Sequence, residues 1–448
     1  MIALKPFWAK DKIICIAIEL RLQPFPLGAI NKIENAQFMK IGILSQGFTG
    51  WGGGIDFIRY MLSYLDEEQK TNPDLHKTLF LPKDNFLEKL KKISYPVRNL
   101  LKQFKKRRAL RWEKRPGFSS GYLQNTYKVF SSSTDIVLAG SNFNAQLRSA
   151  ISEGSDVVFP CMDVPDKSFS LPWVGYLFDF QHRYYPEFFS KDEIQSRNDA
   201  FAKMLFDAQH IVVNGRAVIN DAKMFYPEHT AKLHALPFCP CPMPHWLDVQ
   251  LDVRGKYEIT QPYFLICNQF WKHKDHRTAF LAFKEYYDRG GDALLICTGS
   301  TDDFRFPKYF QEINHLINEL NLTKKIKILG HIPKDDQISL MKNALSVIQP
   351  TLFEGGPGGG ASYEAISLGI PVIASDIPIN KEMNCGELTF FAAGNPMELA
   401  KIMLERGEVP SARSDNATLL AQGLERRKNA GRVLYNVFLE AIKDKRAN

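Results

Sequence analysis

Two glutamates, Glu354 and Glu364, flank a glycine-rich loop that leads into a helix-forming stretch. Glycine lets the backbone approach a ligand closely and adopt positive φ. A loop that enters a helix N-terminus also points free N–H groups at an anion. Carboxylates beside the loop can accept hydrogen bonds from hydroxyl groups. The pattern therefore predicts a ligand that carries both phosphate and a polyol, and a nucleotide sugar has both.

The elements around this loop must hold the two carboxylates in place. A helix is expected over residues 362–368, and Gly369 and a buried strand over residues 371–375 follow it. The alternative is an ordinary strand, turn and helix whose glutamates face solvent. The complete string is more specific than a glycine loop alone, which favours the ligand site.

The string FEGGPGGGASYEAISLGIPVIASD (residues 353–376) resembles the donor-binding motif of retaining GT-B glycosyltransferases of family 4, the glycosyl transferases group 1. In that family seven residues usually separate the two glutamates, whereas nine separate Glu354 from Glu364 here. The resemblance implies that Glu354 contacts donor sugar hydroxyls and that Glu364 binds the ribose. It implies that the backbone between them holds the pyrophosphate or sugar, through Gly355, Gly356, Gly358, Gly359, Gly360, Ala361 and Ser362.

A second segment, NQFWKHK (residues 268–274), falls where family members carry an arginine and, five residues later, a lysine. The resemblance implies that both cations neutralise the leaving diphosphate. Lys274 fits the lysine position, and Lys272 is the alternative. Gln269 stands at the arginine position, and a neutral amide donates a hydrogen bond without supplying charge. Charge at the leaving group would then come from Lys274, from helix N-termini or from a cation elsewhere. Gly299, after the strand expected at residues 293–297, is also assigned to donor binding.

The first half of the chain offers a similar glycine loop and a candidate acidic residue. Gly52, Gly53 and Gly54 follow a short hydrophobic run, and the resemblance implies that they approach the donor phosphates and the acceptor. In the segment WVGYLFDFQHRYYPEFF, Asp179 takes the position of the family aspartate, and Phe178 that of a histidine. Asp179 and the nearby His182 are predicted to be catalytic, together with Glu354 and Lys274. The alternatives are a polar turn capped by Asp179 and a packing role for His182.

Short hydrophobic runs alternate with helical patterns along the chain, which predicts an α/β fold with mostly parallel sheets. The predicted strands cover residues 40–45, 135–139, 156–159, 173–178, 210–213, 263–267, 293–297, 326–329, 345–349 and 371–375. The resemblance implies a GT-B fold with two Rossmann-like domains and a cleft between them. The expected division is an N-terminal extension (1–38), an acceptor domain (39–255), a donor domain (256–415) and a C-terminal helix that crosses back (416–448).

Composition is that of an ordinary globular protein, with 45% hydrophobic and 24% charged residues among 448. Scattered cysteines favour reduced thiols, and no apolar run reaches the ~20 residues of a membrane span. Residues 89–115 hold twelve Lys or Arg against one acidic residue, Glu113, with apolar residues interleaved. This segment predicts either contact with an anionic membrane surface or a solvated insertion. No nucleic-acid-binding module accompanies it, so nucleic acid is not an expected partner.

Together with the resemblance, these observations predict a retaining, metal-independent glycosyltransferase without a cofactor, located in the cytoplasm or peripherally at the inner face of the cytoplasmic membrane. Its substrates would be a nucleotide-sugar donor and a glycan or lipid-linked glycan acceptor, and the resemblance implies surface polysaccharide or lipopolysaccharide synthesis. Three alternatives remain: a non-catalytic sugar-nucleotide-binding protein, a GT-B epimerase and a nicotinamide-dependent oxidoreductase. The last is disfavoured because residues 50–54, GWGGG, lack the third glycine of the dinucleotide fingerprint.

Overall fold

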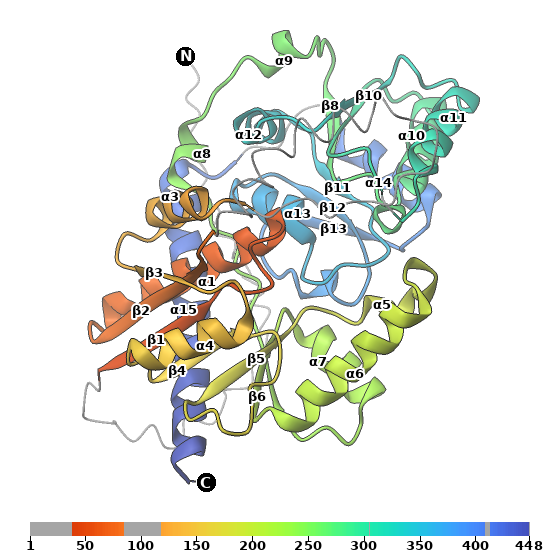
Figure 1. Cartoon of the computed structure of the whole chain (residues 1–448). Helices are drawn as coiled ribbons and strands as arrows, with labels where there is room; N and C mark the ends of the chain where they lie inside the picture. The colour runs from red at the N-terminus through yellow and green to blue at the C-terminus, as the bar shows by residue number, and fades with distance from the viewer. Residues whose placement is uncertain (1–37, 85–117, 304, 408–412, 448) are drawn as a thin grey trace, which may run out of the picture. The chain divides into compact units, whose positions relative to one another are not determined.

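The computed structural model describes residues 38–84, 118–303, 305–407 and 413–447 (Figure 1). The basic segment at residues 89–115 and the expected N-terminal extension, apart from Phe38, lie outside the described residues. The predicted α/β fold is confirmed: the described chain has two domains, each built on a parallel sheet with helices packed on it.

The first domain contains a seven-stranded sheet in the order β3-β2-β1-β4-β5-β6-β7, in which every pairing is parallel. Its strands are β1 (Met39–Leu44), β2 (Leu75–Pro82), β3 (Asp135–Ala139), β4 (Val157–Cys161), β5 (Trp173–Leu177), β6 (His210–Val213) and β7 (Lys232–Ala235). The helices are α1 (Gly52–Thr71), α3 (Ser120–Phe130), α4 (Phe143–Ser152), α5 (Gln181–Tyr184), α6 (Lys191–Asp207) and α7 (Arg216–Phe225).

The second domain repeats this arrangement in six parallel strands, ordered β10-β9-β8-β11-β12-β13. Its strands are β8 (Tyr263–Cys267), β9 (Leu294–Thr298), β10 (Ile326–Gly330), β11 (Val347–Gln349), β12 (Val372–Ser375) and β13 (Leu388–Phe391). The helices are α10 (His276–Asp288), α11 (Tyr309–Glu319), α12 (Lys334–Lys342), α13 (Gly359–Ser367) and α14 (Pro396–Arg406). Short helices α8 (Pro244–Asp248) and α9 (Val253–Lys256) lie on the proline-rich connection between the two sheets.

Both sheets are doubly wound, so each has a point where the strand order reverses. The reversal falls between β1 and β4 in the first sheet and between β8 and β11 in the second. Ligands of open α/β sheets bind beyond the carboxyl ends of the strands at such points. The loops that follow these strands are therefore the ones placed to form a site.

Three strands were not predicted from the sequence: β2, β7 and β13. The hydrophobic run of strand β2 is interrupted by Lys77, whose side chain is fully buried. Its ammonium lies 2.8 Å from Asp66 and donates to Gln69 at 2.6 Å. A buried, paired lysine conceals the hydrophobic run that marks a central strand. Strands β7 and β13 are short and lie at the edges of their sheets.

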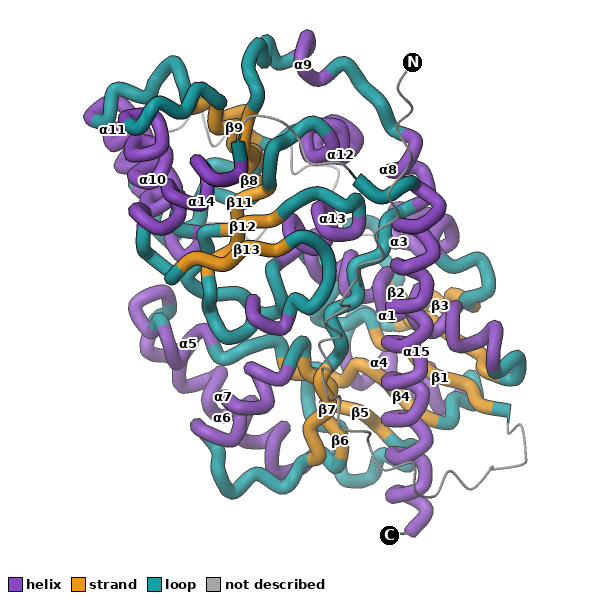
Figure 2. Tube along the Cα trace, turned by 180° about the vertical axis from the view of Figure 1, so that it is seen from behind, coloured by secondary structure: helices purple, strands orange, loops and turns teal. Residues whose placement is uncertain are grey.

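The long C-terminal helix α15 (Asn416–Ala447) joins the two domains (Figure 2). Leu419, near its start, packs in the second domain's core, whereas Leu434 and Phe438 pack in the first. Gly431 makes the crossing possible, because a Cβ there would lie 2.2 Å from the carbonyl oxygen of Tyr64 in α1. Among the residues described, no helix has the length and apolar character required to cross a membrane.

Candidate functional site

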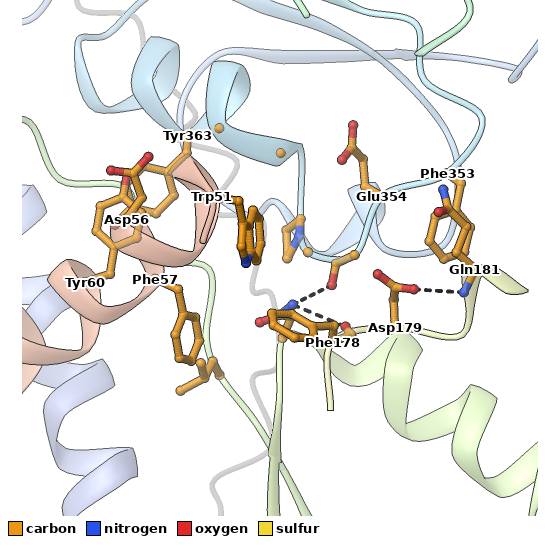
Figure 3. A pocket seen from close by; sticks show the side chains of 18 of the residues that line it. Trp51, Asp56, Phe57, Tyr60, Phe178, Asp179, Gln181, Phe353, Glu354 and Tyr363 are labelled. Carbon is orange, nitrogen blue, oxygen red and sulfur yellow. Dashed lines mark hydrogen bonds between the residues drawn. The ribbon is translucent and has the colours of Figure 1, made fainter. Parts of the chain in front are cut away.

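A cleft of about 610 Å³ is lined by residues of both domains (Figure 3). From the first domain come Gly53, at the start of α1, and Asp179, just after β5. Lys274 and Glu354 come from the second domain, after β8 and β11. These positions are the carboxyl ends of strands, so the cleft occupies the place that the topology favours for a ligand.

Lys274 and Glu354 meet in this cleft although they are 80 residues apart in the sequence. The Lys274 ammonium donates to Glu354 Oε1 at 2.5 Å, and both side chains are largely buried, at 14% and 8% exposure. Gln349 Nε2 donates to the same oxygen at 2.8 Å, and Asn268 Nδ2 donates to Gln349 Oε1 at 2.8 Å. The network fixes one cation and one carboxylate at the reversal point of the second sheet.

Asp179 lies close to the glycine loop of the second domain. A Cβ on Gly355 would lie 2.7 Å from Asp179 Oδ2, so glycine at 355 is what permits this approach. The Gln181 backbone N–H donates to Asp179 Oδ1 at 2.9 Å (Figure 3). Burial raises the pKa of Asp179, the negative charge of Glu354 raises it further, and the Gln181 hydrogen bond opposes the shift. Asp179 and Glu354 thus both line the cleft and are close enough for the charge of one to affect the pKa of the other.

Glu364 lines the same cleft from α13 and is only 7% exposed. Its Oε1 accepts from the Lys334 ammonium at 2.6 Å, and its Oε2 accepts from Gln337 Nε2 at 3.2 Å. Burial raises the pKa of Glu364, and the Lys334 charge opposes that shift. The sequence did not point to Lys334 or Gln337, because they lie on α12, a helix without a motif.

The predicted donor-binding glycines divide into two groups. Gly355, Gly356, Gly359 and Gly360 line the cleft. Gly358, Ala361 and Ser362 do not, and the Gly358 N–H is already bonded to Asn380 Oδ1 at 3.0 Å. Gly358 and Gly359 have φ of +66° and +60°, which glycine adopts without strain. The Gly359 N–H is also engaged, since it donates to the Gly356 carbonyl oxygen at 3.4 Å. The glycines that line the cleft therefore lie at the N-terminal turn of α13 and just before it.

Of Gly52, Gly53 and Gly54, only Gly53 lines the cleft, and the ring of Trp51 lies against Gly53. Gly54 has a packing role, since a Cβ there would lie 2.3 Å from the carbonyl oxygen of Phe48. Gly52 has open space around its Cβ position. The indole of Trp51 is 47% exposed and also lines the cleft, a role that the sequence did not indicate.

Three more predicted site residues, His182, Gln269 and Gly299, lie away from the cleft lining. His182 is buried among Phe180, Phe189 and Phe201 and contacts Asn198 Oδ1 at 3.1 Å, which is a packing environment. Burial lowers its pKa to about 4, so it is neutral at pH 7.

Gln269 and Gly299 also lie outside the lining. Gln269 is exposed on the segment after β8. Gly299 has φ of +130°, and a Cβ there would lie 2.2 Å from the carbonyl oxygen of Asn268, so it serves the packing of two strand ends.

Two further cations that the sequence did not reveal, Arg197 and Arg305, line the cleft, and Arg305 lies on the segment after β9. Its guanidinium lies 5.1 Å from the centre of the Trp271 ring and 5.4 Å from that of Phe188, and it donates to Gln181 Oε1 at 3.5 Å. Burial lowers its pKa, and the charge of Asp303 opposes this. Because β9 is next to β8, its following loop supplies positive charge near the place where Gln269 supplies none.

Asn214 holds the two sides of the cleft together. Its Nδ2 donates to the carbonyl oxygens of Phe178 at 3.2 Å and Gly355 at 2.8 Å. Its Oδ1 accepts from the Tyr176 hydroxyl at 2.6 Å. Tyr176 and Phe178 belong to the first domain and Gly355 to the second, so one amide sets the distance between the two loops.

Comparison with solved structures identifies the class of fold as GT-B. Sucrose-phosphate synthase from Thermosynechococcus elongatus is similar over 90% of this chain and 97% of its own, with a TM-score of 0.52 and 14% identity. Anabaena Alr3699/HepE in complex with UDP and glucose is similar over 90% of this chain and 98% of its own, with a TM-score of 0.51 and 15% identity. The lipopolysaccharide outer core galactosyltransferase WaaB is similar over 90% of this chain and 99% of its own, with a TM-score of 0.52 and 14% identity.

Residues 251–413 match the family model of Glycosyl transferases group 1, so the second half of the chain contains a domain of that family. Among curated proteins, Glycosyltransferase 1 domain-containing protein 1 of Xenopus tropicalis is 25% identical over 150 residues. That alignment spans 34% of this chain and 41% of the Xenopus protein, less than half of its length.

Replacing Gly54 with Ala should lower the free energy of unfolding by about 1–3 kcal/mol, because the new methyl overlaps the Phe48 carbonyl. Gly52→Ala is the matched control from the same turn, and it should change stability by no more than about 0.5 kcal/mol. Urea unfolding of both variants measures the difference. Equal effects would contradict a packing role for Gly54.

Asp179→Asn should stabilise the protein at pH 7. The pKa of Asp179 is raised in the folded chain, so its ionisation opposes folding as pH rises through the folded value. The gain should shrink as pH falls toward 3.8, the value of an unperturbed Asp, and vanish below it. Urea unfolding across this range gives the profile, with Asp207→Asn, an exposed carboxylate at the end of α6, as the control. A loss of stability that is the same at every pH would contradict the inference.

Proposed function

We propose that this protein is a retaining glycosyltransferase that moves a sugar from a nucleotide-sugar donor to a glycan or lipid-linked glycan acceptor. The observation that carries the proposal is the placement of the Lys274–Glu354 ion pair and of Asp179 in the lining of one cleft, beside the N-terminal turn of α13. This arrangement offers positive charge and N–H groups to a diphosphate, and carboxylates to hydroxyl groups.

The similar proteins support this assignment. The Anabaena HepE structures hold UDP, glucose or UDP-glucose, and WaaB is described as a galactosyltransferase of the lipopolysaccharide outer core. A sugar nucleotide is thus the donor we propose, and a surface polysaccharide or lipopolysaccharide the acceptor class. The proposed contact with an anionic membrane rests on the sequence of residues 89–115 alone.

In the proposed donor pose, the diphosphate lies at the α13 turn between Lys274 and Arg305, and Glu364 accepts hydrogen bonds from the ribose. Glu354 and Asp179 face the transferred sugar. As the bond from the anomeric carbon to the phosphate oxygen breaks, Lys274 and Arg305 stabilise the charge on the leaving diphosphate.

The acceptor hydroxyl then attacks the same face of the sugar. Its oxygen bonds to the anomeric carbon, and its proton passes to the leaving phosphate oxygen. Catalysis in this scheme comes from orientation and fixed charge. With two cations at the leaving group, the scheme assigns no step to a metal or another cofactor.

In a thermal-shift panel of UDP, GDP, ADP, CMP and NAD, one nucleoside diphosphate should stabilise the protein against heat. At 100 times its dissociation constant it should raise the free energy of unfolding by about 2.7 kcal/mol. Glu364→Gln should weaken this binding about tenfold or more, because an amide accepts less strongly than a carboxylate. The control is Glu319→Gln on an exposed helix surface. Stabilisation by NAD alone would contradict a glycosyltransferase.

Lys274→Ala should lower kcat by about 10²–10³-fold once a donor and acceptor pair is in hand, since it removes charge from the leaving group. Arg305→Ala should lower kcat in the same direction. Lys272→Ala is the matched control, because Lys272 lies over the Phe306 ring at 4.8 Å and does not line the cleft. NMR of the product should show the donor's anomeric configuration. Equal rates in the Lys272 and Lys274 variants would overturn the role of Lys274, and turnover without an acceptor would indicate an epimerase.

A further inference from the structure

Two histidines and a glutamate gather on the first domain, outside the cleft lining described above. His210 is on β6, His234 is on the edge strand β7, and Glu440 is on α15. One ligand atom from each lies within 4.8 Å of the others. In the described ranges, this is the one group of three His, Cys, Asp or Glu residues with the spacing of a metal site.

The backbone places these side chains together. Strands β6 and β7 are paired in parallel with Val212 opposite His234, so His210 and His234 are diagonal neighbours two residues apart in register and share one face. His210 Nδ1 lies 3.0 Å from His234 Nε2. On α15, Glu440 and Asp444 are four residues apart, which puts both carboxylates on one side of the helix.

Asp444 contacts His210 at Nε2, the ring nitrogen opposite the one that faces His234. His210 Nε2 lies 3.2 Å from Asp444 Oδ2, and the Lys232 ammonium lies 2.7 Å from the same oxygen. When Asp444 accepts a hydrogen bond from the Nε2–H of His210, the ring proton stays on Nε2 and Nδ1 has a lone pair directed at His234. Metal-binding histidines usually have such a carboxylate or carbonyl partner on their second nitrogen.

We propose that His210 Nδ1, His234 Nε2 and a Glu440 carboxylate oxygen bind one divalent transition-metal ion of the zinc class. Two imidazoles and one carboxylate form a ligand set that Zn²⁺ and Co²⁺ accept, with water as the fourth ligand. Bonds of ~2.0–2.2 Å to a tetrahedral ion require a closer set than the present one. Glu440 is exposed on the helix and can rotate toward the two rings.

Imidazole binds a metal in its neutral form. Without an ion, the same atoms form a hydrogen-bonded chain from His234 through His210 to Asp444. Metal titration separates these two states.

The ion would join segments that the chain separates widely. Helix α15 starts in the core of the second domain and ends on the first sheet, where Glu440 and Asp444 lie. A metal bond from Glu440 to β6 and β7 would hold the last turns of α15 on that sheet. The proposal does not depend on the proposed transferase activity, because none of its three ligands lines the cleft.

The test is a titration of the full-length chain, without a polyhistidine tag, with Co²⁺ and Zn²⁺ after dialysis against a chelator. We expect one ion per chain by calorimetry and a visible absorption band for the Co²⁺ form. At 100 times the dissociation constant the ion should raise Tm by about 3 °C, given the usual entropy of unfolding per residue.

Variants separate this site from casual surface binding. His234→Ala and Glu440→Gln should each weaken binding at least tenfold, and Asp444→Asn by about 10–100-fold through loss of the His210 partner. The matched control is His315→Ala, from an exposed His315–Glu319 pair 3.3 Å apart on α11. Circular dichroism checks that each variant is folded.

Binding that survives in folded Glu440→Gln and His234→Ala, or no binding by the wild type at millimolar Co²⁺ and Zn²⁺, would overturn the metal site. In the second case the hydrogen-bonded chain is the resting arrangement. A matching loss of affinity in His315→Ala would also overturn the proposal, because it would assign the ion to exposed imidazoles in general.

Discussion

The close approach of the Gly355 loop to the strand ends of the first domain is the constraint on which the cleft depends. Asn214 bonds the Gly355 carbonyl at 2.8 Å, and the absence of a Cβ on Gly355 leaves room for Asp179. Nearby, the Glu382 carboxylate accepts from the N–H groups of Arg216 and Ala217 at 2.7 and 2.6 Å, at the N-terminus of α7. An anion at a helix N-terminus is stabilised by the N–H groups it meets there. These polar contacts set the spacing at which Asp179 and Glu354 can face one ligand.

That spacing creates an electrostatic problem that the same residues resolve. Burial is the main cause of the raised pKa of Asp179, and repulsion between the two carboxylates in this partly buried cleft adds to it. Lys274 balances Glu354 directly, and the Gln181 hydrogen bond, Arg197 and Arg305 oppose the shift of Asp179. Because Gln349 donates to Glu354 and is itself held by Asn268, the carboxylate and its paired cation Lys274 are fixed before any ligand enters. Fixed charge of this kind stabilises a transition state without reorganisation.

Periodicity was sufficient to predict the fold class and most strands, because parallel strands buried on both faces are near-continuous hydrophobic runs. It failed at β2, where buried Lys77 interrupts the run, and at the short edge strands β7 and β13. Side-chain direction was less predictable. His182 was predicted to be catalytic because it follows Asp179 closely, yet its ring packs among phenylalanines, whereas Arg305, with no motif, reaches the cleft. The His210, His234 and Glu440 cluster was invisible for a related reason: its members meet only after two strands pair and a distant helix packs on them.

The departure at Gln269 has a physical explanation in this arrangement. A leaving diphosphate requires positive charge at a point in space, and the chain position that supplies it is not fixed by that requirement. Strands β8 and β9 are adjacent and parallel, so the segments after both reach the same edge of the sheet. Arg305 extends from the second of these segments, supported by the faces of Trp271 and Phe188. An arginine held on aromatic rings keeps its charge and its planar donors in a partly buried place. The cleft can therefore retain two cations although the usual arginine position is neutral.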